Sequence, residues 1–125
     1  MGKNVVKDKS MEFAIRIVKM YQYLIKNRKE FVLAKQVLRS GTSIGANLAE
    51  ASCAISRNDF LAKVYIAYKE CSETIYWLEL LYKTDYLNTE EFNSIKNDCE
   101  EIHKILSAIT KTMRREKIIS NRQII

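Results

Sequence analysis

Apolar residues recur at helical spacing along four long segments of this chain, and no other feature constrains its fold as much. The repeat predicts helices over about residues 10–27, 31–54, 57–83 and 89–115, each with one apolar face. The chain has no proline and only three glycines, which disfavours sheets joined by tight turns. Because the segments between the helices are short and polar, we expect an all-α fold, an antiparallel up-down-up-down four-helix bundle.

Local capping signals mark three of the expected helix starts. Ser10 stands before the first repeat, where a serine side chain at the N-cap accepts a hydrogen bond from a backbone N–H. Ser56 with Asp59, and Asn88 with Glu91, each place an acidic residue three positions after the cap, as in a capping box. These signals predict where the first, third and fourth helices begin.

The length of the chain and its cysteines limit its organisation. We expect one domain over residues 1–125, with residues 116–125 as a flexible basic tail, because 125 residues suffice for a single buried core. Three widely spaced cysteines without a Cys-x-x-Cys motif argue against a disulfide framework or a zinc site. The first residues lack the apolar core of a signal peptide, and no apolar run approaches the ~20 residues of a membrane span. We expect a cytoplasmic protein with no membrane association, cofactor or metal.

The positive charge is concentrated at the two ends of the chain. The net charge is +6, and residues 1–39 carry ten Lys or Arg against three acidic residues. Residues 111–125 carry five basic residues against one acidic residue, whereas acidic residues outnumber basic ones between these two segments. Since the start of the first helix and the end of the fourth lie at the same end of such a bundle, we expect the two basic groups to converge.

Two glycines four residues apart lie within the second helical repeat. The segment from Gly41 to Gly45 resembles a phosphate-cradling loop, but a Walker sequence requires Gly-Lys-Ser/Thr at its end and Ala46 follows here. The apolar repeat runs through both glycines, so we favour a helix surface that another helix approaches closely. Trp77 on the third helix is our candidate to fill that space.

Polar residues at helical spacing form a line on each of the two central helices. The line on the second helix comprises Gln36, Arg39, Ser43, Asn47 and Glu50, and that on the third comprises Asp59, Lys63, Glu70, Glu73 and Trp77. The antiparallel register predicts the pairs Glu50 with Lys63, Ser43 with Glu70, and Arg39 with Glu73. We interpret them as a partly buried ionic lattice that fixes helix register. The alternative is that Arg39 and Asn47 contact a ligand.

Catalytic arrangements are poorly represented. Glu100-x-x-His103 matches half of a di-iron carboxylate site, but His103 is the only histidine of the chain. Cys99 lies one helical turn from His103, yet its position in the apolar repeat indicates a core residue rather than a nucleophile. We therefore expect no catalytic residues and a protein that is not an enzyme.

The segment 36–51, QVLRSGTSIGANLAEA, closely resembles the signature of the bacterial four helix bundle protein family. The matching continuation comprises Asp59-Phe60, Lys63, Ile66-Ala67, Lys69-Glu70, Glu73-Thr74 and Tyr76 to Leu81. Members of this family include proteins encoded within intervening sequences of large-subunit ribosomal RNA genes, and they are similar to accessory variability proteins of diversity-generating retroelements. The resemblance implies an antiparallel bundle, a homopentamer and no established enzymatic role.

Two functions follow as hypotheses. In the first, basic side chains bind RNA or DNA through phosphate contacts. The candidate residues are Arg16, Lys19, Lys26, Lys111, Arg114, Arg115 and Lys117. Tyr21, Tyr23, Tyr65, Tyr68 and Tyr76 are available to stack on bases, or else line helix and subunit interfaces.

In the second hypothesis the protein is a scaffold or accessory subunit that does not contact nucleic acid. Its partner would be a reverse transcriptase or a ribosome-associated protein. A face of the third helix distinct from the core stripe, formed by Tyr65, Ser72, Tyr76 and Glu79, would bind that partner or a sister subunit.

Overall fold

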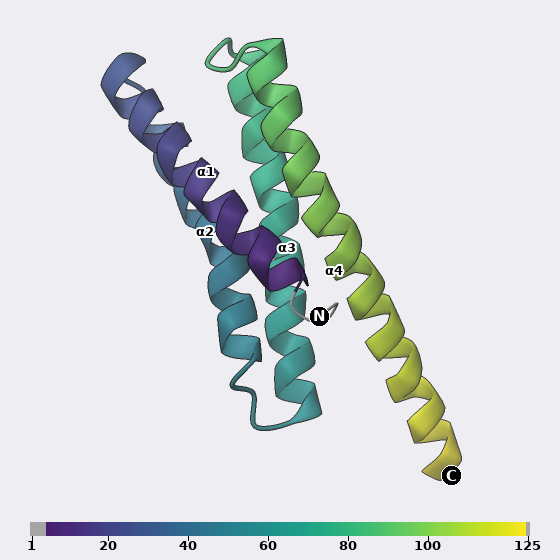
Figure 1. Cartoon of the computed structure of the whole chain (residues 1–125). Coiled ribbons are helices and arrows are strands. Elements are labelled where there is room, and N and C mark those ends of the chain that lie inside the picture. The colour runs from purple at the N-terminus through teal and green to yellow at the C-terminus, as the bar shows by residue number, and fades with distance from the viewer. Residues whose placement is uncertain (1–4, 125) are drawn as a thin grey trace.

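Four helices arranged up-down-up-down form an antiparallel bundle, as the sequence predicts (Figure 1). The structure is a computed structural model that describes the backbone of residues 5–124 and the side chains of residues 5–119. The helices are α1 (Val5–Asn27), α2 (Val32–Ala51), α3 (Arg57–Lys83) and α4 (Thr89–Ile124). Each helix packs against its neighbour in sequence, and α4 closes the bundle onto α1. Among the described residues, no helix is long and apolar enough to cross a membrane.

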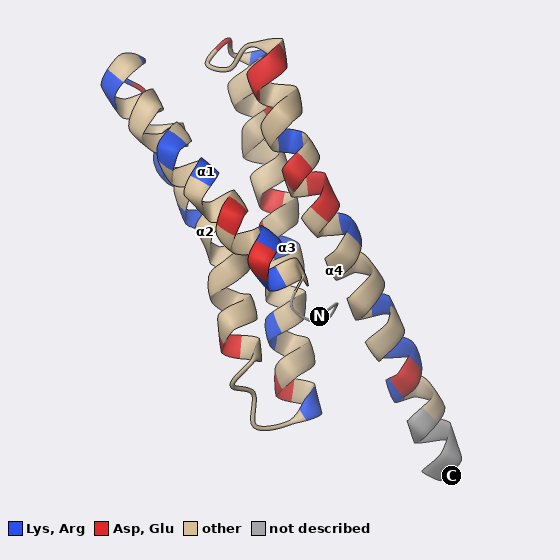
Figure 2. Cartoon of the chain, in the orientation of Figure 1, with Lys and Arg blue, Asp and Glu red and all other residues tan. Residues whose placement is uncertain are grey.

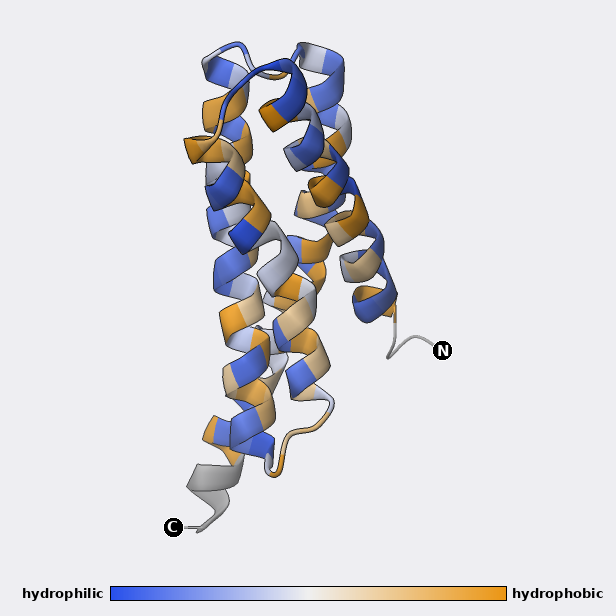
Figure 3. Cartoon of the chain, turned by 90° about the vertical axis from the view of Figure 1, so that its left-hand side faces the viewer, coloured by the Kyte–Doolittle hydropathy of each residue, from blue (hydrophilic) through white to orange (hydrophobic). Residues whose placement is uncertain are grey.

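The core is formed by the apolar faces that the helical repeat predicts. Phe13, Ile17, Ile44, Leu78 and Leu106, from all four helices, are almost fully buried. Burying a side chain of this size contributes roughly 1.5–3 kcal/mol, so tertiary packing rather than helix propensity holds the bundle together. Apolar and hydrophilic residues accordingly alternate along the ribbons (Figure 3).

The first helix begins earlier than predicted. α1 starts at Val5 instead of Ser10, and Ser10 lies inside the helix, fully buried. The apolar repeat reaches back to Val6, which packs into the core at 8% exposure, so Ser10 occupies a core position instead of a cap. The prediction of an N-cap at Ser10 was wrong because a serine in a core-facing position resembles a cap in sequence.

The second helix is shorter than predicted at its end. It stops at Ala51 rather than residue 54, and Ile55, which follows it, is 95% exposed. The capping geometry of α3 explains the break: Ser56 is extended and its Oγ accepts from the Asp59 N–H at 3.0 Å. Asp59 in turn accepts the Ile55 N–H at 3.3 Å. Phe60, in the first turn of α3, is also 37% exposed.

The other two caps form as predicted. α3 spans Arg57–Lys83, the predicted range. At the start of α4 the Asn88 and Glu91 side chains each accept the other residue's backbone N–H at 2.8 Å. The reciprocal pair satisfies two backbone donors, which is the purpose of a capping box.

The fourth helix is longer than predicted. It continues to Ile124, so residues 116–124, expected to be a flexible tail, are helical; residue 125 lies outside the described residues. An ion pair between Arg57 of α3 and Glu116 holds this extension near the start of α3. α4 reaches beyond the lower end of the bundle, while α1 begins well above that end (Figure 1).

The two glycines of α2 face α1 rather than α3. A Cβ built on Gly41 lies 2.9 Å from Ile17 Cγ1, and one on Gly45 lies 3.6 Å from Ser10 Cβ. The predicted close approach of a second helix is therefore present, but Ile17 fills the space and Trp77 does not. Because both glycines lie within one continuous helix, they do not form a phosphate-cradling loop.

Candidate nucleic-acid interface

Arg39 is the centre of a polar cluster between α2 and α3. Its guanidinium contacts the carboxylate of Glu70 at 3.3 Å and forms an ion pair with Glu73. Trp77 Nε1 also donates to Glu73, at 2.8 Å, and Gln36 Oε1 accepts from Arg39 at 3.4 Å. The Arg39 side chain is 51% exposed and Glu70 is 20% exposed, so the cluster lies at the surface of the α2–α3 seam.

Of the two other pairs predicted between α2 and α3, one is present and one is absent. Lys63 donates to Glu50 at 2.8 Å, as predicted, and this bond raises the pKa of Lys63. The predicted pair of Ser43 with Glu70 is absent, because the short Ser43 side chain bonds the carbonyl of Arg39 at 2.7 Å. Asn47 likewise bonds a carbonyl of its own helix, that of Ser43, at 2.8 Å.

Some basic residues of α1 form ion pairs with carboxylates of α4, and others form none among the described side chains. Arg16 contacts Asp98 of α4 at 2.6 Å and Ser94 Oγ at 3.0 Å. Lys9 forms an ion pair with Glu101, which raises the pKa of Lys9. Lys19 and Lys26 take part in no ion pair among the side chains described, 5–119. Arg16 is thus held by a carboxylate, and a phosphate would have to displace it.

The basic groups of α1 and α4 do not converge as predicted. Lys9 lies opposite Glu101, whereas the basic segment of α4 begins at Lys111 and reaches Lys117. At 1.5 Å per residue these positions lie about 15–24 Å further along α4. α1 begins well above the end that α4 reaches, so the acidic middle of α4 faces the basic start of α1.

A group of exposed cations lies toward the C-terminal end of α4. Its members are Lys111, Arg114, Arg115 and Lys117, all exposed, and we call this group the α4 basic segment. None of them belongs to an ion pair among the side chains of residues 5–119. Basic residues gather on the lower half of α4, whereas acidic ones are frequent in its upper half (Figure 2).

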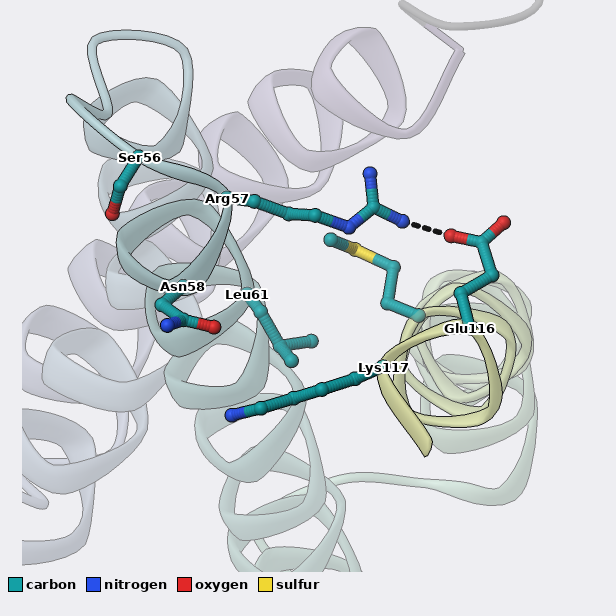
Figure 4. Close-up of a pocket in the computed structure, with 7 residues that line it drawn as sticks. Ser56, Arg57, Asn58, Leu61, Glu116 and Lys117 are labelled. Atoms are coloured by element: carbon teal, nitrogen blue, oxygen red, sulfur yellow. Dashed lines mark hydrogen bonds and ion pairs between the residues drawn. The ribbon is translucent and has the colours of Figure 1, made fainter. Parts of the chain in front are cut away.

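A cavity of about 500 Å³ lies between the start of α3 and the α4 basic segment (Figure 4). It is lined by Ser56, Arg57, Asn58, Leu61, Met113, Glu116 and Lys117. Arg57, which was not among the residues predicted for the site, pairs here with Glu116 across the cavity. The signal in the sequence that could have identified Arg57 is its position directly after Ser56, the N-cap of α3.

The groups considered for catalysis have other partners. His103 Nε2 shares a 2.9 Å hydrogen bond with Ser72 Oγ of α3. The Cys99 thiol faces Cys71, with the two sulfurs 3.6 Å apart, and not His103. The hydrogen bond with Cys71 and burial both raise the pKa of Cys99, which disfavours the reactive thiolate. Within the described residues no cluster of three His, Cys, Asp or Glu side chains is placed to hold a metal ion.

Four antiparallel helices with a polar seam between α2 and α3 define an all-α bundle protein. The chain belongs to the 23S rRNA-intervening sequence protein family, whose model matches residues 2–108. It is similar to a protein of unknown function from the S23 ribosomal protein family of Bacteroides thetaiotaomicron, with 59% identity and a TM-score of 0.84. That alignment covers 86% of this chain and 99% of the other. No curated protein matches the chain.

Proposed function

We propose that this protein is a non-enzymatic oligomer that binds nucleic acid through the α4 basic segment. The observation that carries the proposal is that four exposed cations lie between residues 111 and 117 of α4, and none has a carboxylate partner among residues 5–119. The acidic residue among them, Glu116, pairs with Arg57. Exposed Lys and Arg side chains bind phosphates by releasing counterions, which requires no particular base sequence. The description of the family refers to ribosomal RNA, which supports RNA as the first probe.

The α4 basic segment is a feature of this chain beyond the family match. That match ends at residue 108, and all four cations follow it. Lys19 and Lys26, on α1, have no ion pair within the described side chains and are secondary candidates for phosphate contacts. Arg16 contributes less, because Asp98 and Ser94 already bind its guanidinium.

Self-association would multiply this basic surface. Met11, Ile15 and Val18 recur at helical spacing on α1 and are 64%, 49% and 38% exposed. An apolar stripe of this kind on a helix that already buries its other face favours contact with a second copy. We propose a homopentamer, the assembly that the family resemblance implies.

The exposed free Cys53 and the unbonded pair of Cys71 and Cys99 support a reducing compartment, the cytoplasm.

Fluorescence anisotropy with a labelled structured RNA at several salt concentrations tests the proposal, with the mass of the oligomer measured in parallel. We expect the affinity to fall steeply with salt, with a slope of roughly 0.9 for each phosphate contacted. Replacing Arg114, Arg115 and Lys117 by Gln should weaken binding and reduce that slope. A matched control replaces Lys29, Lys35 and Lys69 by Gln, which removes the same charge elsewhere. Equal effects of the two triple variants would contradict a specific role for α4.

A protein scaffold is the second candidate, and the exposure of α3 supports it. Tyr76 and Ile66 are 59% and 41% exposed on this helix. A reverse transcriptase or a ribosome-associated protein would bind the exposed surface of α3. Within the face that the sequence suggested, Tyr65 and Ser72 already contact α4, at Arg114 and His103 respectively. RNA binding that is absent even at low salt would favour this candidate.

A further inference from the structure

Aromatic rings form a continuous row across α3 and α4. The Tyr65 and Tyr68 rings have centroids 6.0 Å apart with planes at 63°, and Tyr68 lies 4.7 Å from the His103 ring at 31°. The guanidinium carbon of Arg114 lies 5.3 Å from the centroid of Tyr65, at the end of the row. All three rings are partly exposed. We call this set, Tyr65, Tyr68 and His103, the aromatic row.

Two shallow grooves lie along α4 beside the aromatic row. One, of about 620 Å³, is lined by His103, Lys104 and Lys111 together with the acidic Glu100. The other, of about 630 Å³, contains Lys111, Arg114 and Arg115. Lys111 lines both grooves, His103 lines the first, and Arg114, which lies over the Tyr65 ring, lines the second. Cationic side chains beside aromatic faces are the combination that single-stranded nucleic acids bind.

Arg28 and Arg114 each lie over a tyrosine ring, but they differ in their hydrogen bonds. Arg28 lies 4.9 Å from the centroid of Tyr86, and the carbonyls of Asp85 and Tyr86 accept from its guanidinium at 3.0 and 3.1 Å. Arg114 has no such hydrogen bond among residues 5–119, and its guanidinium carbon lies over the Tyr65 ring. A stronger partner, such as a phosphate, can therefore draw Arg114 away and leave the ring face open.

We propose that the aromatic row and its two grooves bind single-stranded nucleic acid, with an unpaired base stacking on Tyr65 and the adjacent phosphates contacting Arg114 and Lys111. This inference rests on the proposed function and specifies its substrate. In a duplex the faces of the bases are occupied by neighbouring bases, so only an unpaired base can stack on a side chain. The basic segment alone would not distinguish the two forms, because both carry phosphates.

The experiment compares a fluorescein-labelled oligouridine RNA with a duplex RNA of equal length, using the full chain at low salt. We expect Tyr65→Leu to weaken single-strand binding about tenfold, the effect of losing one stacked base, and to leave duplex binding unchanged. Tyr65→Phe, which keeps the ring, should bind as the unaltered protein does. Tyr86→Leu removes a tyrosine with the same arginine contact at the other end of the bundle and should change neither affinity. Lys111→Gln should weaken binding of both probes.

The outcomes separate this inference from the proposed function. Suppose that Lys111→Gln weakens the binding of both RNAs, but Tyr65→Leu leaves both affinities unchanged or weakens both equally. The role of the aromatic row is then overturned, while the proposed basic surface stands. If neither probe binds, both proposals are overturned. A photocrosslink from 5-iodouridine RNA to the unaltered protein is independent of any effect of substitution on folding. Crosslinks at Tyr65 or Tyr68 support the aromatic row, and crosslinks confined to other residues overturn it.

Discussion

Ile17 of α1 packs directly onto Gly41 of α2. Three side-chain atoms of Ile17 lie within 3.3 Å of the position that a Cβ on Gly41 would take. Ile17 is fully buried and β-branched, so it has little freedom to move aside. The glycine therefore sets the separation of α1 and α2, and this separation lets α1 close the bundle against α4.

Gly41→Ala is expected to destabilise the bundle by up to about 2 kcal/mol. An extra methyl group in a packed core costs typically 1–3 kcal/mol, which exceeds the roughly 1 kcal/mol gained in helix propensity. Gly45→Ala is the matched control, because its nearest neighbour atom is 3.6 Å away and an alanine fits there. Gly45→Ala should increase stability by up to about 1 kcal/mol. Urea unfolding measures both, and a Gly41→Ala protein at least as stable as Gly45→Ala would contradict the close contact.

Ser10→Ala is expected to leave the stability unchanged or to raise it. The Ser10 Oγ is buried and has no hydrogen-bond partner among the described residues, so its removal relieves an unsatisfied polar atom. If Ser10 were a helix cap instead, the same change would cost about 1 kcal/mol. Ser56→Ala provides the comparison, since Ser56 does cap α3 and should lose about that amount. Thermal unfolding of the two variants distinguishes a buried serine from a capping one.

The apolar repeat was sufficient to predict the fold but not the ends of the helices. It placed α3 correctly, where Ser56 and Asp59 supply a cap, and it identified four antiparallel helices. It failed at Ser10, because a serine at a core position and a serine at a cap look alike in sequence. It failed again beyond residue 115, where the Arg57 to Glu116 ion pair, a tertiary contact, supports a segment without an apolar repeat.

The polar contacts were predictable only between helices joined by a short turn. The turn between α2 and α3 fixes their register, so the pairing of Glu50 with Lys63 followed from residue numbers alone. α1 and α4 have no such connection, and their relative offset depends on how far each helix extends. The contact of Arg16 with Asp98, and the separation of the two basic groups, could not be predicted for that reason.

Glu73→Ala is expected to destabilise the protein more than Arg39→Ala. The Glu73 carboxylate binds both the Arg39 guanidinium and the Trp77 indole, so its loss leaves two donors without this partner. Arg39 is 51% exposed, and a surface ion pair contributes about 0.2–1 kcal/mol, so Arg39→Ala should cost an amount in that range. Urea unfolding, with oligomer mass as a second readout, checks both. An Arg39→Ala protein unchanged in melting and assembly would eliminate the structural role that we assign to this residue.

The three cysteines are expected to differ sharply in reactivity. The hydrogen bond with Cys71 and burial raise the pKa of Cys99, and alkylation requires the thiolate, so Cys99 should react only after unfolding. Cys71 is equally buried and should be protected with it, whereas the exposed Cys53 should react in the native protein. Mass spectrometry after treatment with iodoacetamide should show one modified thiol under native conditions and three in denaturant. Fast modification of Cys99 in the native state would mean that α3 and α4 separate readily, because the thiol is enclosed between these helices.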